Sequence, residues 1–197
     1  MKRAIDVCGA LVGLIVLSPV LAATAIVVRL KLGTPVLFRQ QRVGKDERVF
    51  EIIKFRTMTD ERGPGGELLP DSARLTVFGR WLRSTSLDEL PELLNVLRGD
   101  MSLVGPRPLL VHYLPRYRGE ERRRHEVRPG LTGLAQVRGR NDLGWDERLA
   151  LDVAYVDTRS TWLDLRLLLE TVVGVVRRSG VSAAGHATMP ELGEDRA

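Results

Sequence analysis

Residues 7–28 are the most apolar part of the chain and contain no charged side chain. At a rise of about 1.5 Å per residue, a helix of this length could cross a bilayer core of about 30 Å. Ser18 and Pro19 lie at its midpoint, where a proline removes a backbone hydrogen bond and bends the helix. The segment is therefore expected to form a helix that is broken at Ser18-Pro19.

Basic residues flank this segment at both ends: Lys2, Arg3, Arg29 and Lys31. Because basic flanks favour the cytoplasmic side of a membrane, both ends are expected on the same face. Residues 1–33 are therefore predicted to form a re-entrant membrane helix, with the Ser18 hydroxyl bound to the carbonyl that Pro19 leaves unpaired. A single-pass anchor and a cleavable signal peptide are the alternatives, although Asp6 interrupts the early part of a signal peptide.

The polar and apolar pattern changes after residue 33. Two short runs of β-forming residues, 36–43 and 48–58, surround Gly44-Lys45-Asp46-Glu47 and predict a small β-hairpin. Glycines, prolines and charges predict a surface loop over residues 59–72. Further along, we expect helices over 75–83, 88–98, 145–157 and 162–178, and a strand over 134–137.

The last of these helices is amphipathic. It carries one apolar stripe, made of Leu165, Leu168, Leu169, Val172, Val173 and Val176. Core packing is the more common explanation of such a stripe, and contact with a membrane surface is the alternative. Together the elements predict an α+β fold, with short and amphipathic helices at a membrane interface. One catalytic domain is expected over residues 34–180, followed by a C-terminal tail over residues 181–197.

Composition adds a preference for anionic ligands. The 197 residues have a net charge of +5, and 30 of them are basic, of which only Lys2, Lys31, Lys45 and Lys54 are lysines. Arginine binds phosphate in a bidentate manner and stays charged at pH 7, so phosphorylated ligands, anionic lipid and nucleic acid are all plausible partners. The single cysteine, Cys8, excludes an intramolecular disulfide and is expected to pack within the apolar helix.

Asp88 and Glu89 are adjacent carboxylates just before Leu90-Pro91. Proline suits the first turn of a helix, so the pair is expected beside a helix N-terminus. Ser86 and Glu89 have the spacing of a capping box, which offers a purely structural account of the acidic residues. From this spacing alone capping is the more common explanation, and a chemical role is the alternative.

Arginines on both sides of the pair change this balance. Arg83 precedes the carboxylates, and Arg107 lies between Pro106 and Pro108, whose rings restrict the local backbone. A carboxylate nucleophile, a second carboxylate for a divalent cation and arginines for phosphate are the groups needed to attack a diphosphate. Mg²⁺ is the expected metal, since it prefers carboxylate and phosphate oxygens.

These residues resemble the bacterial sugar transferase family, the monotopic phosphoglycosyl transferases. The resemblance covers most of the chain and rests on an ordered set of motifs: the basic and apolar start with Ser18-Pro19, Lys54-Phe55-Arg56-Thr57-Met58, residues 80–108, RPGLTGLAQVRGRN over residues 128–141, and Asp152 with Tyr155. Leu134 departs from the tryptophan expected before Ala135-Gln136, which puts local packing or sugar contacts in doubt.

The resemblance implies a mechanism and a location. Asp88 would be the nucleophile and Glu89 the partner of Mg²⁺. A UDP-sugar would lose UMP to a phospho-sugar intermediate on Asp88, and this group would pass to polyprenyl phosphate by a ping-pong route. The expected location is one leaflet of the bacterial inner (cytoplasmic) membrane, with the catalytic domain on the cytoplasmic face. The implied phosphate- or substrate-binding residues are Arg83, Arg107, Lys54, Arg56, Arg138, Arg140, Asn141 and Asp152.

A second functional hypothesis is a membrane-tethered binding protein whose basic surface holds anionic lipid or nucleic acid. Its support is the high pI and the cluster Arg122-Arg123-Arg124, for which a solvated helix face is the commoner explanation. Interleaved aromatic residues, which stack on bases in single-strand binders, are missing. We therefore expect no nucleic-acid partner.

Overall fold

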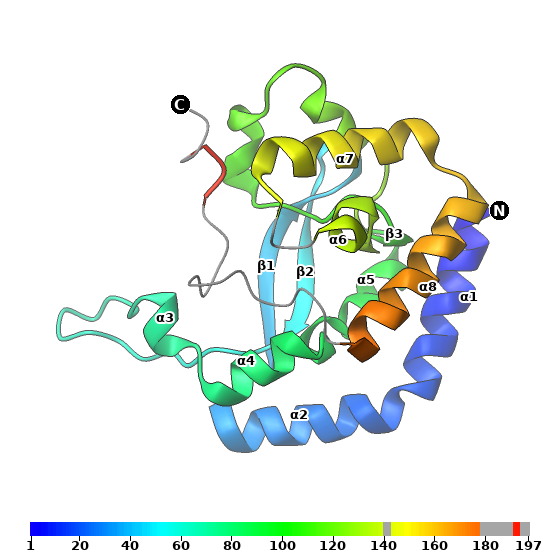
Figure 1. The fold of residues 1–197 in the computed structure, drawn as a ribbon. Coiled ribbons are helices and arrows are strands. Elements are labelled where there is room, and N and C mark those ends of the chain that lie inside the picture. The colour runs from blue at the N-terminus through cyan, green and yellow to red at the C-terminus, as the bar shows by residue number, and fades with distance from the viewer. Residues whose placement is uncertain (140–142, 178–190, 194–197) are drawn as a thin grey trace.

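The structure is a computed structural model that describes residues 1–139, 143–177 and 191–193 (Figure 1). Its elements, in chain order, are α1 (Lys2–Val16), α2 (Ser18–Leu32), β1 (Leu37–Val43), η1 (Lys45–Glu47), β2 (Val49–Phe55), α3 (Asp71–Arg74), α4 (Val77–Ser84), η2 (Leu87–Glu89), α5 (Glu92–Arg98), β3 (Ser102–Val104), η3 (Val111–Arg116), η4 (Gly119–Glu126), β4 (Gly130–Thr132), α6 (Leu134–Arg138), α7 (Trp145–Thr158) and α8 (Thr161–Arg177). Helices combine with two small sheets, so the predicted α+β class is confirmed.

The apolar N-terminal segment forms two helices, α1 and α2, bent by 63° at their junction. Ser18 Oγ donates a hydrogen bond of 2.8 Å to the Ile15 carbonyl, which stands four residues before Pro19 and receives no N–H from it. The expected break and hydroxyl contact are confirmed. No single helix among the described residues is long and apolar enough to cross a membrane, whereas the bent pair passes this test together. The path of the pair through a membrane stays a prediction.

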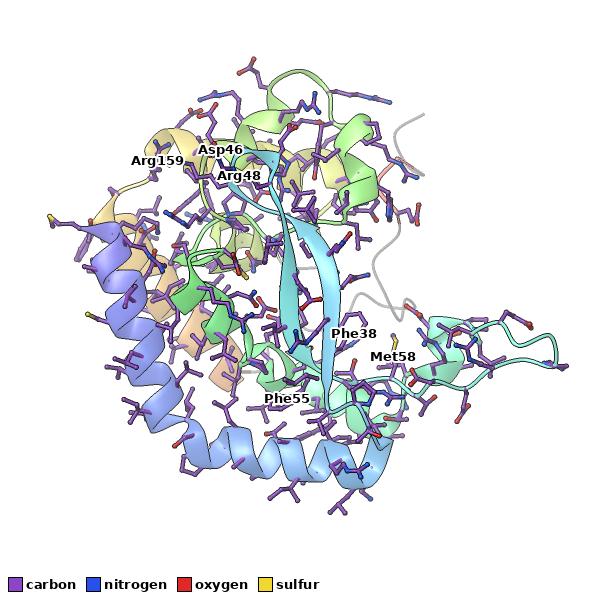
Figure 2. The ribbon with its side chains drawn as sticks, turned by 180° about the vertical axis from the view of Figure 1, so that it is seen from behind. Phe38, Asp46, Arg48, Phe55, Met58 and Arg159 are labelled. Atoms are coloured by element: carbon purple, nitrogen blue, oxygen red, sulfur yellow. The ribbon has the colours of Figure 1, made fainter. Side chains whose placement is uncertain are left out.

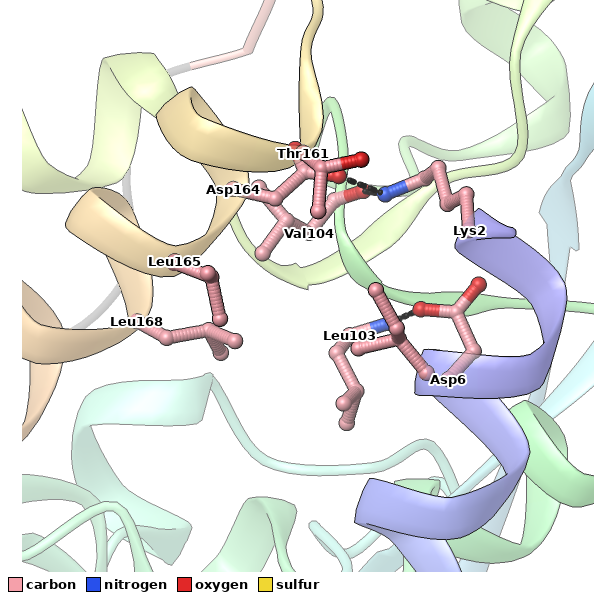
Figure 3. A pocket seen from close by; sticks show the side chains of 9 residues that line it. Lys2, Asp6, Leu103, Val104, Thr161, Asp164, Leu165 and Leu168 are labelled. Atoms are coloured by element: carbon pink, nitrogen blue, oxygen red, sulfur yellow. Dashed lines mark hydrogen bonds and ion pairs between the residues drawn. The ribbon is translucent and has the colours of Figure 1, made fainter.

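Polar residues at the start of α1 bind later segments of the chain (Figure 3). Lys2 Nζ lies 2.6 Å from Asp164 Oδ2 on α8. Asp6 is buried, and its Oδ1 accepts hydrogen bonds from Ser102 Oγ at 2.8 Å and from the Leu103 amide at 3.0 Å, both on β3. These side chains therefore attach α1 to β3 and α8.

Arg3 makes a third attachment, at the C-terminal end of α5. Its guanidinium donates to the carbonyls of Val96 at 2.6 Å and Leu97 at 3.0 Å, where a cation also complements the helix dipole. Ala10 is fully buried in the same core cluster as α5. Signal-peptide cleavage after the small residues that follow Leu21 would remove these contacts, which counts against that alternative.

The predicted hairpin is confirmed by the antiparallel pair β1 and β2, in which Leu37 lies opposite Phe55. Figure 2 shows Asp46 and Arg48 at the turn and Phe38 and Phe55 at the opposite end, near α2. Phe55 is buried there against α2 and α4. The expected surface loop over residues 59–72 is the long arm that projects beyond α3 in Figure 1.

The stretch predicted as one helix over residues 88–98 consists of two pieces. A short 3-10 turn, η2, holds the carboxylate pair, and α5 begins only at Glu92, with Pro91 as its N-cap. The capping box at Ser86 is wrong, because its side chain makes no capping hydrogen bond. Ser86 has a left-handed backbone with φ 56°, a geometry that turns the chain before the pair.

The strand predicted over residues 134–137 is also wrong, because Leu134–Arg138 form the helix α6. The strand in this region comes earlier: Gly130–Thr132 form β4, which pairs in parallel with β3. A short apolar run fits a strand or a buried helical turn equally well by periodicity. Here the chain leaves β4 at Gly133. A Cβ atom on residue 133 would lie only 2.1 Å from the carbonyl oxygen of Gly105.

The apolar stripe of α8 is not simply core. Leu168 packs against the main core cluster, but Leu165, Leu169, Val172 and Val173 are exposed. Leu167, which lies off the predicted stripe, is fully buried. The side chain of Val176 lies outside the described residues. The expectation that the stripe packs in the core is therefore wrong for most of its described members, and their exposure agrees with the membrane-surface alternative.

The main core lies between α1, β2, α5, β3, α7 and α8. Its buried members are Ala10, Ile52, Leu93, Val96, Met101, Leu103, Val104, Tyr155 and Leu167. Most of the predicted tail lies outside the described residues, but Leu192 is fully buried against Tyr113 and Trp145 in a second cluster.

Cys8 is exposed on α1 rather than packed in the protein interior, so the expectation that this side chain packs is wrong.

Candidate active site

The carboxylate pair lies in η2, in the turn that connects α4 to α5. Asp88 retains only 6% of its accessible surface. The side chain of Glu89 points toward β2 and the loop after β3, from which two cations reach its Oε1 atom. Each of these cations comes from a motif that the sequence singled out, and the fold brings all three segments together.

Lys54 on β2 is the first of these cations. Its Nζ atom lies 2.8 Å from Glu89 Oε1 and 2.9 Å from Glu92 Oε1. Asn95 sets this alignment, because its buried amide accepts from the Ile53 N–H at 3.0 Å and donates to the Glu51 carbonyl at 2.7 Å. The amide therefore holds α5 against β2 through the two residues that flank Ile52, just before Lys54.

Arg107 is the second cation. It follows β3 in the Pro106-Arg107-Pro108 loop, and its Nη2 atom donates to Glu89 Oε1 at 2.6 Å. Arg42, Lys54, Glu92 and Arg107 line one hollow beside the carboxylate pair. Among the described residues, lysine, arginine and carboxylate groups therefore meet in this hollow, and its Lys54 and Arg107 contact Glu89 directly.

The two adjacent carboxylates differ in pKa. Burial, with the charge of neighbouring Glu89, raises the pKa of Asp88 to about 6. Burial also opposes ionisation of Glu89, but the charges and hydrogen bonds of Arg107 and Lys54 outweigh it and hold the pKa of Glu89 well below its ordinary value. Glu89 is therefore a fixed anion, whereas Asp88 titrates near neutral pH.

The pKa values of the two cations that contact Glu89 are shifted upward. The Glu89 carboxylate raises the pKa of Arg107 despite burial. Burial lowers the pKa of Lys54, but Glu89 and Glu92 outweigh it and the net shift is upward. Burial raises the pKa of Glu92 to about 7, with the charge of Lys54 opposing the rise. Around the carboxylate pair, Lys54, Arg107 and Glu89 therefore stay charged, whereas Asp88 and Glu92 have pKa values of about 6 and about 7.

Arg83 and Arg56, both predicted to bind phosphate, are placed differently. Arg83 Nε donates to Thr57 Oγ1 at 3.2 Å. Burial lowers the pKa of Arg83, and among its neighbours Asp88 opposes this most strongly. Arg56 instead donates to the carbonyls of Met58 at 2.9 Å and Thr34 at 2.8 Å, contacts that hold the chain where β2 leaves the hairpin. Arg83 thus lies near Asp88, whereas Arg56 holds the backbone through its two carbonyl contacts.

The remaining candidates are not gathered at the carboxylate pair. Arg138 is exposed at the end of α6, and Arg140 and Asn141 lie outside the described residues. Asp152 is buried on α7, where its Oδ2 atom receives two hydrogen bonds from Arg124. Substrate contacts by these four residues stay predictions.

Sequence reasoning missed two residues of the site, Glu92 and Arg42. Glu92 stands three residues after Glu89, a spacing that places both side chains on one face of a helical turn, and this was an available signal. Arg42 had no such signal in the sequence, because it reaches the hollow from β1, which is far from Asp88-Glu89 along the chain. Its guanidinium donates to Gln40 Oε1 at 2.6 Å, and burial followed by repulsion from Arg107 lowers the pKa of Arg42 to about 10.

The Arg122-Arg123-Arg124 cluster is not a free basic surface. Arg122 pairs with Glu47 at 3.1 Å and Arg123 with Asp157 at 2.5 Å. Arg124 is buried. With its charges paired, the cluster no longer supports the hypothesis of a basic surface for nucleic acid or lipid.

Comparison with known proteins defines the class. The chain matches the bacterial sugar transferase family over residues 1–178. It is 52% identical over 188 residues to EpsL of Bacillus subtilis, an uncharacterized sugar transferase, covering 95% of this chain and 93% of the relative. The chain belongs to the bacterial sugar transferase family, and it is an enzyme of that class, as the motifs implied.

Two further relatives have more specific names. The UDP-glucose:undecaprenyl-phosphate glucose-1-phosphate transferase of Caulobacter vibrioides is 44% identical over 182 residues, which are 87% of this chain and 68% of the relative. The undecaprenyl-phosphate galactose phosphotransferase of Salmonella typhimurium is 38% identical over an alignment of 197 residues, and this alignment covers 91% of this chain but only 41% of the relative.

Proposed function

We propose that this enzyme is a phosphoglycosyl transferase that moves a phospho-sugar from a UDP-sugar to polyprenyl phosphate and releases UMP. The observation that carries the proposal is the convergence of Lys54 and Arg107 on the carboxylate pair Asp88-Glu89. The names of the relatives from Caulobacter vibrioides and Salmonella typhimurium support the acceptor, and the former supports a UDP-sugar donor. The product would be a polyprenyl-diphosphate-sugar, the first membrane-bound intermediate of a glycoconjugate.

Asp88 is the proposed nucleophile. A carboxylate oxygen of Asp88 attacks the sugar-bearing phosphorus, the bond from that phosphorus to the bridging oxygen breaks, and UMP leaves with the electron pair. A phosphate oxygen of the polyprenyl carrier then attacks the same phosphorus and displaces the Asp88 carboxylate. With a pKa of about 6, Asp88 is mostly ionised at pH 7 and still basic enough to be a competent nucleophile.

The cations stabilise the negative charge that develops during this exchange. Arg107 and Lys54 are preorganised by Glu89, so they need little rearrangement when phosphate oxygens arrive. Arg83, next to Asp88, and Arg42, across the hollow, add positive charge where the leaving UMP would carry its own negative charge. Glu89 in this arrangement holds the cations in place and keeps them charged.

Mg²⁺ fits the donor set. In enzymes that act on phosphates, Mg²⁺ commonly binds one or two carboxylates together with substrate phosphate oxygens, and Asp88-Glu89 supply such a pair. Among the described residues no group of three or more His, Cys, Asp or Glu side chains could hold a metal alone, which agrees with a metal that arrives with its substrate. When bound, Mg²⁺ would neutralise phosphate charge as a Lewis acid.

We also propose that the bent pair α1–α2 is a re-entrant anchor on the cytoplasmic face of the bacterial cytoplasmic membrane. Apolar side chains on this pair are exposed, namely Leu11, Val12, Ile15, Val16, Val20, Ile26, Val27 and Leu30. Trp81 on α4 and Trp162 on α8 are exposed too, as is typical of aromatic residues at headgroup depth. A polyprenyl phosphate keeps its tail in the bilayer, so an enzyme anchored at this depth meets the reacting phosphate at the membrane surface.

The deciding experiment measures UMP release from a panel of UDP-sugars with polyprenyl phosphate and Mg²⁺. Wild type is compared with Asp88→Asn and Glu89→Gln, and with Asp46→Asn as the control, since Asp46 is an exposed turn residue. Asp88→Asn should abolish turnover and Asp46→Asn should preserve it. Unchanged turnover in Asp88→Asn would refute the nucleophile assignment.

The covalent step has its own test. After incubation with the UDP-sugar and Mg²⁺ but without acceptor, the intact mass of wild type should increase by one phospho-sugar. Asp88→Asn should show no increase. An adduct on Asp88→Asn would place the intermediate elsewhere, and UMP release that strictly requires the acceptor would favour direct transfer instead.

A further inference from the structure

Arg107 lies in a loop whose backbone is held from three sides. The flanking residues Pro106 and Pro108 have no N–H of their own to donate, yet all three carbonyls of the loop receive a hydrogen bond. The donors come from three separate segments: Gly130 N to Pro106 O at 3.0 Å, Arg124 Nη2 to Arg107 O at 2.7 Å, and Arg42 Nη1 to Pro108 O at 3.5 Å.

The donor to the Arg107 carbonyl, Arg124, is deeply buried together with its carboxylate partner. The side chains of Arg124 and Asp152 retain only 2% and 3% of their exposure. Arg124 Nε and Nη2 donate to Asp152 Oδ2 at 3.0 and 2.7 Å, and Nη1 donates to the Tyr117 hydroxyl at 3.2 Å. One guanidinium therefore joins η3–η4, α7 and the active-site loop.

The buried ion pair between Arg124 and Asp152 carries a desolvation cost. Removing two charges from water costs several kcal/mol, and apolar residues of the same volume are often at least as stabilising. What apolar residues cannot do is hold a carbonyl oxygen at a defined point. The rigid planar fork of arginine can donate to a carboxylate and a carbonyl at fixed angles, and here its Nη2 atom contacts both.

We infer that Arg124, held by Asp152, is a positioning residue that sets the location of Arg107 in the active site. The inference rests on the proposed function of Arg107 as a phosphate-binding cation. The backbone of Arg107 is held by Arg124 at one end and its guanidinium meets Glu89 at the other. A shift of the backbone therefore displaces the guanidinium from the carboxylate and from the substrate phosphates.

The test is a double-mutant cycle in the full-length enzyme. Arg124→Lys keeps the charge but loses the fork, and it is made in wild type and in Arg107→Lys. Arg123→Lys is the matched control, since this adjacent arginine pairs with Asp157 at the protein surface. For every variant, kcat and KM for the UDP-sugar are measured by UMP release, and melting temperature is measured in parallel.

Arg124→Lys should lower kcat/KM by about tenfold to a hundredfold, the loss expected for a small misplacement of a catalytic group. The loss should divide between kcat and KM in the same way as in Arg107→Lys. In the Arg107→Lys background, Arg124→Lys should cost almost nothing further, and Arg123→Lys should resemble wild type. Losses that multiply would show that Arg124 acts independently of Arg107, and would overturn the inference.

Tyr117→Phe is the milder variant if Arg124→Lys does not fold. It removes one hydroxyl that accepts from Arg124 and keeps the ring beside His125. It should cause a several-fold loss of kcat/KM that disappears in the Arg107→Lys background, and no loss, or an additive loss, would count against the inference. If wild type itself releases no UMP from any UDP-sugar, the proposed function fails; an active wild type with unaffected variants refutes only the positioning role.

Discussion

The buried carboxylate of Asp6 ties α1 to β3, and replacing it should affect both stability and catalysis. Asp6 accepts hydrogen bonds from Ser102 Oγ and the Leu103 amide. Asp6→Ala leaves two buried donors without a partner, at about 1–3 kcal/mol each, so about 2–6 kcal/mol in total. Asp6→Asn keeps one carbonyl oxygen as an acceptor and should cost about 1–2 kcal/mol.

These energies convert into melting temperatures. For a chain of this size, 1 kcal/mol shifts the melting temperature by about 2–4 °C. A loss of about 4 kcal/mol in Asp6→Ala should therefore lower it by about 8–16 °C, and Asp6→Asn by about 2–8 °C. The measurement is thermal unfolding followed by intrinsic fluorescence in detergent or nanodiscs, because Trp145 is buried in the catalytic part.

The same replacement should reach the catalytic site. Ser102–Val104 form β3, and the chain continues directly from this strand into the loop that carries Arg107. Turnover of Asp6→Ala, measured well below its melting temperature, should therefore fall as well. Asp46→Asn is the control and should match wild type. If Asp6→Ala has the same melting temperature as wild type, the reasoning that this carboxylate connects α1 to β3 is refuted.

Three further predictions follow from the site and the anchor. Because Asp88 attacks in its ionised form and its pKa is about 6, turnover should fall about tenfold from pH 7 to pH 5; a flat pH–rate profile would contradict this. Lys54→Met leaves Glu89 without one of its cations and should destabilise the fold by about 3 kcal/mol, seen in denaturant unfolding, with loss of turnover; wild-type behaviour would show that the ion pair is dispensable. Replacing Ser18 and Pro19 together by alanine should straighten the bent pair, so that cysteine labelling finds its two ends on opposite faces of the membrane; unchanged labelling would refute the role of the break.

Local patterns in the sequence were enough to predict much of the molecule. The break at Ser18-Pro19 follows from the covalent structure of proline, and the hairpin from β-forming runs around a glycine-containing turn. The ordered motifs around Asp88-Glu89 and Arg107 identified the family and supplied the residues of the candidate site. Each of these inferences depends on residues close together in the chain, where spacing and backbone chemistry decide the structure.

Packing between distant segments decided the rest. The strand in this region is Gly130–Thr132, which pairs with β3, and residues 134–137 that follow it are helical, a choice that a short apolar run does not encode by itself. Glu92 and Arg42 joined the site only when α5 and β1 met beside Lys54. Arg124 looked like part of a charged surface and is instead buried beneath Arg107. Sequence alone thus named the groups that carry the proposed chemistry, whereas only the tertiary structure showed what holds them in place, because those contacts join residues far apart in the chain.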